Sequence, residues 1–260
     1  MQHGRAFDGR AVTNMAVAAD RVNLTVVIPA FNEEERIGTT LRVLAGYLSA
    51  RPWTWAIRVV DDGSSDDTAG VVTEIGRDVP AVVLQREPHR GKGGAVKAGM
   101  LAPGGGAFRF LCDADLAMPV EELARFLPPA LSDFDVAIGS REGHGARRVG
   151  EPLLRHLMGR AFNYTVQRAV LRGIEDTQCG FKMFTAQAAE AIFPRVTVNG
   201  WAFDIEVLYV ARLLGLRTVE VPVEWHYQSE SQVSILRDSV GMLREVLRIR
   251  ARARRGEYDR

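Results

Sequence analysis

Short, unbroken apolar runs alternate with longer stretches of helical periodicity along most of this chain. Runs of this kind are typical of buried parallel strands, and they lie at residues 24–30, 56–60, 81–84, 110–111, 135–139 and 219–223. Helical spacing fills the segments between them, at about residues 33–48, 68–75, 119–131, 153–171 and 201–214. The alternation predicts an α/β protein of one domain, with a doubly wound, mostly parallel sheet and helices on both faces.

Polar clusters follow three of the predicted strands. Asn32-Glu33 comes after the first strand, where Asn32 is a candidate N-cap for the next helix. Asp61-Asp62 follows the second strand, and Asp113-Ala114-Asp115 follows Phe110-Leu111. The carboxyl ends of parallel strands meet at one edge of a sheet, where ligands bind in folds of this class. We therefore expect the three clusters to build one site.

Asp113 and Asp115 are the candidate metal ligands. In extended backbone their side chains point to the same side, because side chains alternate with period two. Two convergent carboxylates suit Mg²⁺ or Mn²⁺, which keeps several waters and binds a diphosphate. A solvated turn is the alternative interpretation of an isolated Asp-X-Asp.

A basic, glycine-rich segment spans residues 90–99 and begins a predicted helix. Glycines let backbone N–H groups approach an anion, and the helix N-terminus adds partial positive charge. It is not a Walker A loop, because Lys92 is followed by glycine, and it does not directly follow a strand as a dinucleotide fingerprint would. The alternative interpretation of this segment is a flexible surface turn without a ligand.

The last third of the chain carries three further features. Residues 142–151 are rich in Gly and Arg and are predicted to form a mobile loop, whereas 176–184 form a strand or turn. Residues 235–255 form an amphipathic helix with a local net charge of +5 and Leu236, Val240, Leu243 and Leu247 on one face. Such a helix can lie on anionic lipid; alternatively it packs on the core with a solvated basic end.

Composition argues against some classes of protein, and the sequence pattern divides the chain into three segments. A formal net charge of +1 over 260 residues argues against nucleic-acid binding. Two cysteines far apart indicate a reducing compartment, and no apolar run reaches the ~18 residues of a membrane span. We expect a disordered tail at 1–21, the folded α/β domain at 22–234 and the basic amphipathic helix and tail at 235–260. The expected location is cytoplasmic, peripheral on the inner face of a membrane.

Over roughly residues 24–250 the chain resembles family-2 glycosyltransferases with the GT-A fold, most nearly those of the dolichyl-phosphate (polyprenyl-phosphate) β-glucosyltransferase type. The ordered motifs that carry the resemblance are VIPAFNEE at 27–34, VVDDGSSD at 59–66, RGKGGAV at 90–96, DAD at 113–115, IGSR at 138–141, DTQCGFK at 176–182 and WAFDIE at 201–206. Each motif is moderately specific, and the ordered set is highly specific.

The resemblance implies roles at matching positions. The nucleotide-sugar site would consist of Pro29, Ala30, Phe31, Glu33, Asp61 (reading the base), Lys92, Asp113 and Ala114. Asp115 and Arg141 would be catalytic, with Asp204 orienting the acceptor or acting as a base, unless it is simply an acid in the first turn of a helix. The acceptor phosphate would be bound by Arg141, Arg155, Arg160 and Arg237.

The implied reaction is an inverting transfer of glucose from UDP-glucose to a polyprenyl phosphate. Ala117 stands where relatives that use GDP-mannose tend to have Gln, which favours UDP-glucose. The family's Gly-Ser-Lys appears as Glu230-Ser231-Gln232, where Arg237 is expected to substitute for the lost charge. The alternatives are a GDP-mannose donor, a hydroxyl acceptor on a polysaccharide, or a binding protein without turnover.

Overall fold

The computed structural model describes residues 23–227 and 235–259, so the predicted tail at 1–21 and Gln232 lie outside it. The strands are β1 (Asn23–Ala30), β2 (Thr54–Asp61), β3 (Val82–Arg86), β4 (Phe108–Leu111), β5 (Val136–Ser140), β6 (Arg147–Val149), β7 (Lys182–Thr185), β8 (Thr218–Pro222) and β9 (Glu224–His226). The helices are α1 (Glu34–Ser49), α2 (Thr68–Asp78), α3 (Lys92–Leu101), the 3₁₀ helix η1 (Val120–Phe126), α4 (Leu153–Ala169), α5 (Ala186–Ile192), α6 (Phe203–Leu213) and α7 (Ile235–Arg254).

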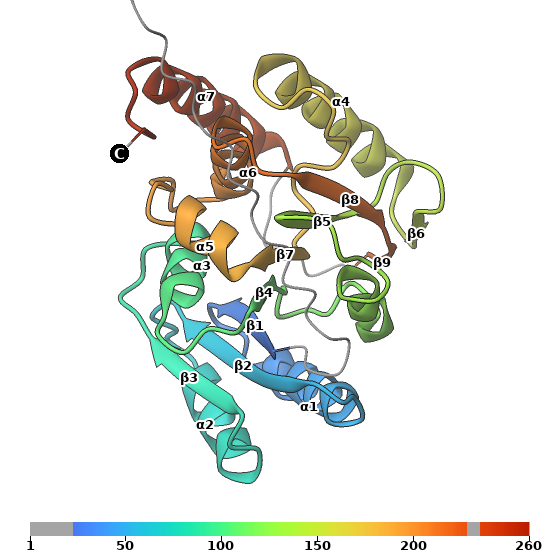
Figure 1. Cartoon of the computed structure of the whole chain (residues 1–260), viewed down its shortest axis with the longest axis vertical. Coiled ribbons are helices and arrows are strands. Elements are labelled where there is room, and N and C mark those ends of the chain that lie inside the picture. The colour runs from blue at the N-terminus through green and yellow to red at the C-terminus, as the bar shows by residue number, and fades with distance from the viewer. Residues whose placement is uncertain (1–22, 228–234, 260) are drawn as a thin grey trace, which may run out of the picture.

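A seven-stranded sheet organises the fold, in the order β3-β2-β1-β4-β7-β5-β8 (Figure 1). β7 is antiparallel to β4 and β5, and the other neighbouring pairs are parallel. β6 and β9 form a separate parallel pair. The mostly parallel sheet predicted from the sequence is confirmed.

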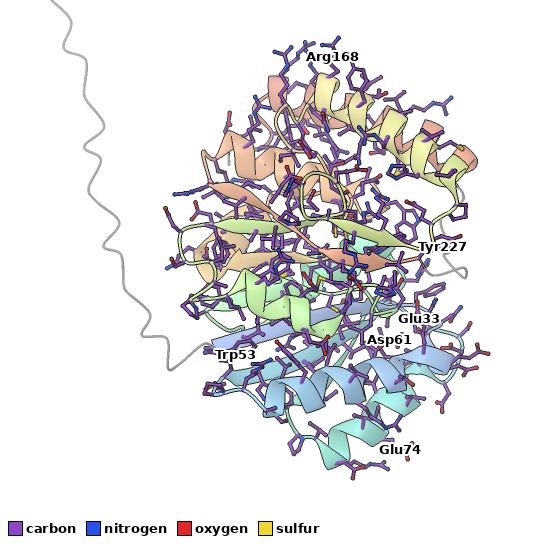
Figure 2. All side chains as sticks on the ribbon, turned by 90° about the vertical axis from the view of Figure 1, so that its right-hand side faces the viewer. Glu33, Trp53, Asp61, Glu74, Arg168 and Tyr227 are labelled. Carbon is purple, nitrogen blue, oxygen red and sulfur yellow. The ribbon has the colours of Figure 1, made fainter. Side chains whose placement is uncertain are left out.

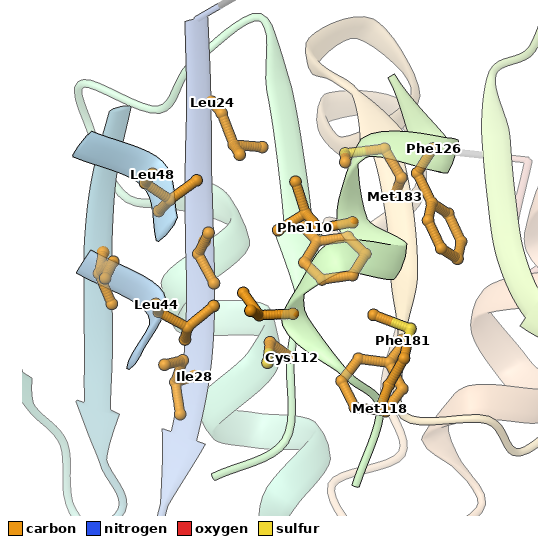
Figure 3. Close-up of a cluster of buried hydrophobic side chains, with 14 of the residues drawn as sticks. Leu24, Ile28, Leu44, Leu48, Phe110, Cys112, Met118, Phe126, Phe181 and Met183 are labelled. Atoms are coloured by element: carbon orange, nitrogen blue, oxygen red, sulfur yellow. The ribbon is translucent and has the colours of Figure 1, made fainter. Parts of the chain in front are cut away.

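Helices cover both faces of the sheet, as the alternating apolar runs predict. On β1, Ile28 belongs to the core under α1 and η1, whereas Val27 belongs to the core under α3 and α6. Figure 3 shows the first of these cores, with Leu44 and Leu48 of α1 beside Ile28. Because both faces are buried, the strands are continuously apolar instead of alternating.

Two local predictions were wrong. The helix expected at 119–131 is only the 3₁₀ helix η1, because Leu127 precedes two prolines and is extended, at φ −124° and ψ 156°. Asn32 is not an N-cap: it has φ 55°, Glu33 takes the cap position, and the Asn32 carboxamide accepts from the Ser65 N–H at 2.9 Å.

The C-terminal helix was predicted at 235–255 and is confirmed as α7. Its inward face differs from the predicted apolar face, because Met242, Val246 and Ile249 are buried in the core whereas Leu243 and Leu247 are exposed. The side chains of residues 235–240 are not described. No helix among the described residues is long and apolar enough to cross a bilayer.

Part of the predicted loop at 142–151 also has regular structure. Arg147–Val149 forms β6, which pairs with β9. Arg147 donates to the Glu224 carboxylate at 2.9 Å across this pair. The segment is therefore attached to the strand that follows β8.

Candidate active site

A cavity of about 520 Å³ lies where β1, β2 and β4 end. Figure 2 shows Glu33 and Asp61 near each other at this edge of the sheet. The volume is in the range of about 300–1,000 Å³ that is usual for small-molecule sites. Every residue assigned above to the nucleotide sugar lies on the cavity wall except Asp61. The expected convergence of the strand ends is therefore observed.

The wall of the cavity divides between the two halves of the chain. The N-terminal half contributes Pro29, Ala30, Phe31, Glu33, Arg36, Asp62, His89, Gly91, Lys92, Ala95, Asp113, Ala114, Asp115 and Ala117. The C-terminal half contributes Arg141, Arg148, Glu151, Gly159, Asn163, Gln178, Gly180, Phe181, Gly200, Trp201, Asp204, Trp225 and Met242.

The Asp113-Ala114-Asp115 turn lies at the centre of this wall. Lys92 Nζ is 2.6 Å from Asp113 Oδ1, and Asp115 Oδ1 accepts from the Ala117 N–H at 3.1 Å. The turn is fixed from behind by Thr40, whose hydroxyl donates to the Ala114 carbonyl at 2.6 Å. A Cβ on Gly180 would lie 1.9 Å from Asp113 Oδ2, so any larger residue at this position would have to displace the Asp113 carboxylate.

Burial, and then the neighbouring charge of Asp113, raise the pKa of Asp115. Two partly buried carboxylates that repel each other are a donor set that a divalent cation stabilises. No cluster of three or more His, Cys, Asp or Glu side chains suited to a metal exists among the described residues. Asp113 and Asp115 therefore fit Mg²⁺ or Mn²⁺ only if diphosphate and water complete its coordination.

Asp62 holds the glycine-rich segment against the sheet. Its carboxylate accepts from the N–H groups of Arg90 and Gly91, both at 2.8 Å, and lies 2.9 Å from His89 Nδ1. The His89 ring stacks on Phe31 with centroids 4.3 Å apart. Asp62 thus positions both an aromatic wall and the start of α3, a role that the sequence did not reveal.

Asp61 lies behind the cavity wall formed by the described residues. It is fully buried, accepts from the Ser64 N–H at 2.9 Å and is 3.4 Å from Arg86 Nε. The neighbouring Glu33 lies on the wall and pairs with Arg36. Burial raises the pKa of Glu33 above its usual value.

The glycine-rich segment reaches the cavity as the N-terminus of α3. Gly91 has φ 99°, and the Gly93 N–H donates to the Asn199 carbonyl at 2.7 Å. A Cβ on Gly93 would lie 2.4 Å from the Val198 carbonyl oxygen, so the two segments touch through backbone. Burial lowers the pKa of Lys92, but the charges of Asp113 and Asp204 outweigh burial and hold it above its usual value.

A buried carboxylate in α6 fixes the segment that the glycines touch. Glu206 accepts from the N–H groups of Thr197 and Val198, both at 2.7 Å. It also accepts from the Tyr258 hydroxyl at 2.6 Å. Burial, and then the bond to Glu206, raise the pKa of Tyr258. The C-terminal end of the described chain is thereby connected to the segment that contacts the start of α3.

Arg141 is oriented by a carboxylate in the segment before β7. Its Nε and Nη2 donate to Asp176 at 2.7 and 2.8 Å, and its backbone N–H donates at 3.0 Å. Burial raises the pKa of Asp176, but the charge and hydrogen bonds of Arg141 outweigh burial and hold it well below its usual range. The guanidinium lies 5.3 Å from the centre of the Trp225 ring, on the cavity wall.

A second arginine, Arg148 of β6, lies on the same wall. It donates to Glu142 and Glu151, both at 2.6 Å, and its Nε donates to the Arg141 carbonyl at 3.0 Å. Its guanidinium is 6.0 Å from the Trp225 ring centre. The sequence reasoning missed Arg148 and Trp225, because their proximity depends on the β6–β9 pairing.

Asp204 lies in the first turn of α6 and is almost fully buried. Lys182 Nζ donates to Asp204 Oδ1 at 2.6 Å and to the Cys179 carbonyl at 2.5 Å. Burial raises the pKa of Asp204, although Lys182 and Lys92 oppose the shift. The sequence analysis included Lys182 in the motif at 176–182 but assigned it no role in the site.

The expected acceptor arginines are only partly brought together. Arg160 of α4 is exposed, lies off the cavity wall formed by the described residues and is 3.3 Å from Glu142. The side chains of Arg155 and Arg237 lie outside the described residues.

Comparison with known proteins agrees with this architecture. The model of the family "Glycosyl transferase family 2" matches residues 25–193. The chain is similar to a dolichyl-phosphate beta-glucosyltransferase of Trichomonas vaginalis, with 38% identity covering 82% of this chain and 67% of the relative. The corresponding protein of Dictyostelium discoideum is 33% identical, covering 90% and 75%, and the human one 32% identical, covering 90% and 77%.

Solved structures support the same fold. Mannosyl-3-phosphoglycerate synthase from Rubrobacter xylanophilus has a TM-score of 0.66 at 20% identity, covering 91% of this chain and 75% of its own. Glucosyl-3-phosphoglycerate synthase from Mycobacterium tuberculosis, in complex with Mn²⁺ and UDP-glucose, has a TM-score of 0.61 at 17% identity, covering 87% and 77%. The predicted GT-A fold is confirmed.

Proposed function

This chain belongs to glycosyl transferase family 2 and is a glycosyltransferase, and from that premise we propose that it transfers glucose from UDP-glucose to a polyprenyl phosphate with inversion. One observation carries the proposal. A single cavity has a pair of carboxylates beside Lys92 on one wall and the oriented pair Arg141 and Arg148 on another. The first set suits a metal-bound diphosphate and the second an anionic acceptor.

At the donor end, Asp113 and Asp115 would hold Mg²⁺ or Mn²⁺, which neutralises the departing diphosphate when it is bound. Lys92 adds a positive charge at the same place, and the N-terminus of α3 adds the partial positive charge of the helix dipole. The wall formed by Pro29, Ala30, Phe31 and Glu33 surrounds the nucleoside. Base reading by Asp61 stays a prediction, since Asp61 lies behind that wall.

At the acceptor end, Arg141 and Arg148 position the phosphate. A phosphate oxygen attacks the anomeric carbon as the bond from that carbon to the diphosphate oxygen breaks, and UDP leaves with the electron pair. A phosphate monoester is largely dianionic at neutral pH, with a second pKa of about 6. The nucleophile therefore needs no strong base, and catalysis is mainly electrostatic and positional.

The environment of Asp204 supports a phosphate acceptor over a sugar hydroxyl. A hydroxyl acceptor needs a general base within reach of its proton. Asp204 lies on the cavity wall, but it is almost fully buried and its Oδ1 accepts a hydrogen bond from Lys182 Nζ at 2.6 Å. In this proposal Asp204 is a positioning residue that keeps Lys182 and the neighbouring segment in place.

Transfer of radiolabel tests the reaction. The purified chain is incubated with Mg²⁺ or Mn²⁺, a polyprenyl phosphate and labelled UDP-glucose, and the organic phase is counted. Label in the lipid is the expected result. Ala117 lies on the cavity wall, at the position where relatives that use GDP-mannose tend to have Gln. A parallel reaction with GDP-mannose should therefore give much less label than the reaction with UDP-glucose. Label from GDP-mannose alone would refute the donor, and label only in a polysaccharide would refute the acceptor.

Peripheral membrane binding at the cytoplasmic face follows from the proposed acceptor. Arg244, Arg248 and Arg250 of α7 are exposed, and each cation near an anionic surface contributes roughly 1 kcal/mol. We expect the protein to sediment with vesicles containing phosphatidylglycerol and to dissociate in high salt. Equal sedimentation with neutral vesicles would refute the electrostatic contribution of α7.

A further inference from the structure

A second cavity, of about 340 Å³, lies where the C-terminal ends of α4 and α6 meet α7. Among the described residues its wall holds no acidic side chain and four arginines, which we call the arginine pocket: Arg168, Arg172, Arg212 and Arg250. The whole chain has 33 basic and 32 acidic residues, so composition alone does not account for four cations without an acid. The pocket is therefore a strongly positive concave surface.

The arginine pocket is separate from the candidate active-site cavity, because the two walls share no residue. Helix α6 connects them: Asp204 in its first turn lies on the active-site wall, and Arg212 in its last turn lies on the pocket wall. Eight helical residues separate the two by about 12 Å along the axis. Figure 2 shows Arg168 at one end of the molecule, far from Glu33 and Asp61. An anion in the pocket would not touch the reacting groups.

We propose that the arginine pocket is a second anion site, which binds a phosphate group that carries about two negative charges. The phosphate belongs either to a free phosphorylated molecule or to a lipid head group, and the experiment below distinguishes these sources. The proposal does not depend on the proposed reaction.

The charge of the pocket is the first argument. Guanidinium groups remain protonated at any physiological pH, so four of them around one cavity repel one another. A bound anion relieves this repulsion. The planar fork of an arginine matches phosphate oxygens with two parallel hydrogen bonds, and a phosphate monoester carries about two negative charges at neutral pH. A phosphate therefore fits this set of side chains better than a single carboxylate does.

Donors without partners are the second argument. Arg172 and Arg250 are exposed and make no hydrogen bond, ion pair or ring contact with another described residue. The hydroxyl of Tyr209, on the same wall, also makes no hydrogen bond with a described residue, although its ring packs against the core. The pocket thus presents two guanidinium groups and a hydroxyl on a fixed ring, all of which can donate to an anion.

Neutralisation of helix ends is the alternative explanation, and it accounts for only half of the set. Arg168 and Arg212 lie in the last turns of α4 and α6, where cations are favourable. Arg212 Nη1 donates to the Val170 carbonyl at 3.3 Å, and Arg168 lies 5.4 Å from the centre of the Tyr164 ring. Arg172 lies beyond the end of α4, and Arg250 lies before the last turn of α7, so helix ends do not explain these two.

The first test measures the binding of radiolabelled inorganic pyrophosphate by equilibrium dialysis in EDTA. Without a metal, the repelling carboxylates of Asp113 and Asp115 disfavour pyrophosphate in the active-site cavity. We expect Arg172→Gln/Arg250→Gln to raise the Kd at least tenfold, because each charge-assisted hydrogen bond that is lost weakens binding by about that factor. The variant should fold normally, since neither side chain has a partner among the described residues.

Arg42→Gln/Arg77→Gln is the matched control. These two arginines of α1 and α2 are also exposed and without a partner among the described residues, so the variant loses the same charge away from the pocket. At about 0.15 M salt, charges farther apart than about 8 Å are largely screened, so the Kd of the control should equal that of the wild type. An equal rise of the Kd in both double variants would overturn the site and leave only an effect of net charge.

Hydrogen–deuterium exchange locates the bound pyrophosphate. We expect protection in the peptides that contain the C-terminal ends of α4 and α6. Protection confined to the peptides of β1, β4 and α3 would place the anion in the active-site cavity and overturn the second site.

Sedimentation with phosphatidylcholine vesicles that contain phosphatidic acid distinguishes the two sources of phosphate. If Arg172→Gln/Arg250→Gln weakens vesicle binding at least tenfold relative to the control, and free pyrophosphate does not bind the wild type, the ligand is a lipid head group. If the variant loses pyrophosphate but binds vesicles as the control does, the ligand is a free phosphorylated molecule. If neither probe distinguishes the two double variants, the pocket is not an anion site.

Discussion

Replacing Asp176 with asparagine tests how Arg141, the arginine proposed to bind the acceptor phosphate, is held. Asp176 is fully buried and accepts three hydrogen bonds from Arg141, whose side chain is largely buried. The variant leaves the guanidinium without its counter-charge. Removing one partner of a buried ion pair costs about 3–5 kcal/mol, which for a chain of this size corresponds to a fall in Tm of roughly 6–20 °C.

Differential scanning calorimetry at pH 7 measures the stability change, and prenyl-phosphate KM reports the orientation of Arg141. Asp176→Asn/Arg141→Met should recover most of the lost Tm, because it removes the unpaired charge, but it should not recover activity. If Asp176→Asn lowered Tm by less than about 2 °C, the ion-pair argument would be refuted.

The same pair gives a pH dependence with a definite sign. Because the pKa of Asp176 is lowered in the folded state, its contribution to stability is complete above the unfolded pKa of about 3.9 and decreases as pH falls below that value. The Tm difference between wild type and Asp176→Asn should therefore be constant from pH 8 to 5 and should shrink below pH 4. A difference that changes between pH 8 and 6 would assign the effect to another group.

Three further substitutions address the metal site, the close packing beside it and the C-terminal anchor. Asp115→Asn should abolish sugar transfer with either Mg²⁺ or Mn²⁺ and leave Tm within about 2 °C of wild type, because it removes repulsion with Asp113; near-normal turnover would exclude Asp115 as a ligand. Gly180→Ala should lower kcat on the order of tenfold to a hundredfold by displacing Asp113, and an unchanged kcat would show that the site tolerates the shift. Tyr258→Phe should destabilise the fold by about 1–3 kcal/mol in urea unfolding, since it leaves Glu206 short of a donor. Because the folded pKa of Tyr258 is raised, the wild-type advantage should persist up to about pH 10 and then decline.

The sequence predicted the sheet and the convergence of its strand ends on one cavity, because both depend on local order. A strand followed by a polar turn, as at Asp113-Ala114-Asp115, places its side chains at the sheet edge wherever the strand is parallel. The cavity wall proposed to bind the acceptor depends on pairings between segments distant in the chain. Arg148 reaches Trp225 only because β6 pairs with β9, and no local signal marks that pairing.

The same reasoning explains why the sequence could not tell which face of a helix is buried, or which of two adjacent carboxylates reaches the cavity. Helical periodicity identified α7, but it could not decide which apolar face is buried, because the helix has one apolar face inside and another outside. Asp61 and Asp62 are equivalent in the sequence, yet the chain turns so that Asp62 reaches the cavity wall and Asp61 does not. Only tertiary structure separates adjacent carboxylates of this kind.

The bond between Tyr258 and Glu206 has a consequence for how this fold can be divided. The segment from β1 to α3 resembles a self-contained unit, yet the N-terminus of α3 rests on Asn199. The backbone next to Asn199 is held by Glu206, which also binds Tyr258 near the end of the described chain. A fragment that ended after α3, or a chain cut before Tyr258, would lack part of the support for the start of α3. The first half of this protein therefore could not be exchanged between relatives as a module unless its C-terminal residues were exchanged with it.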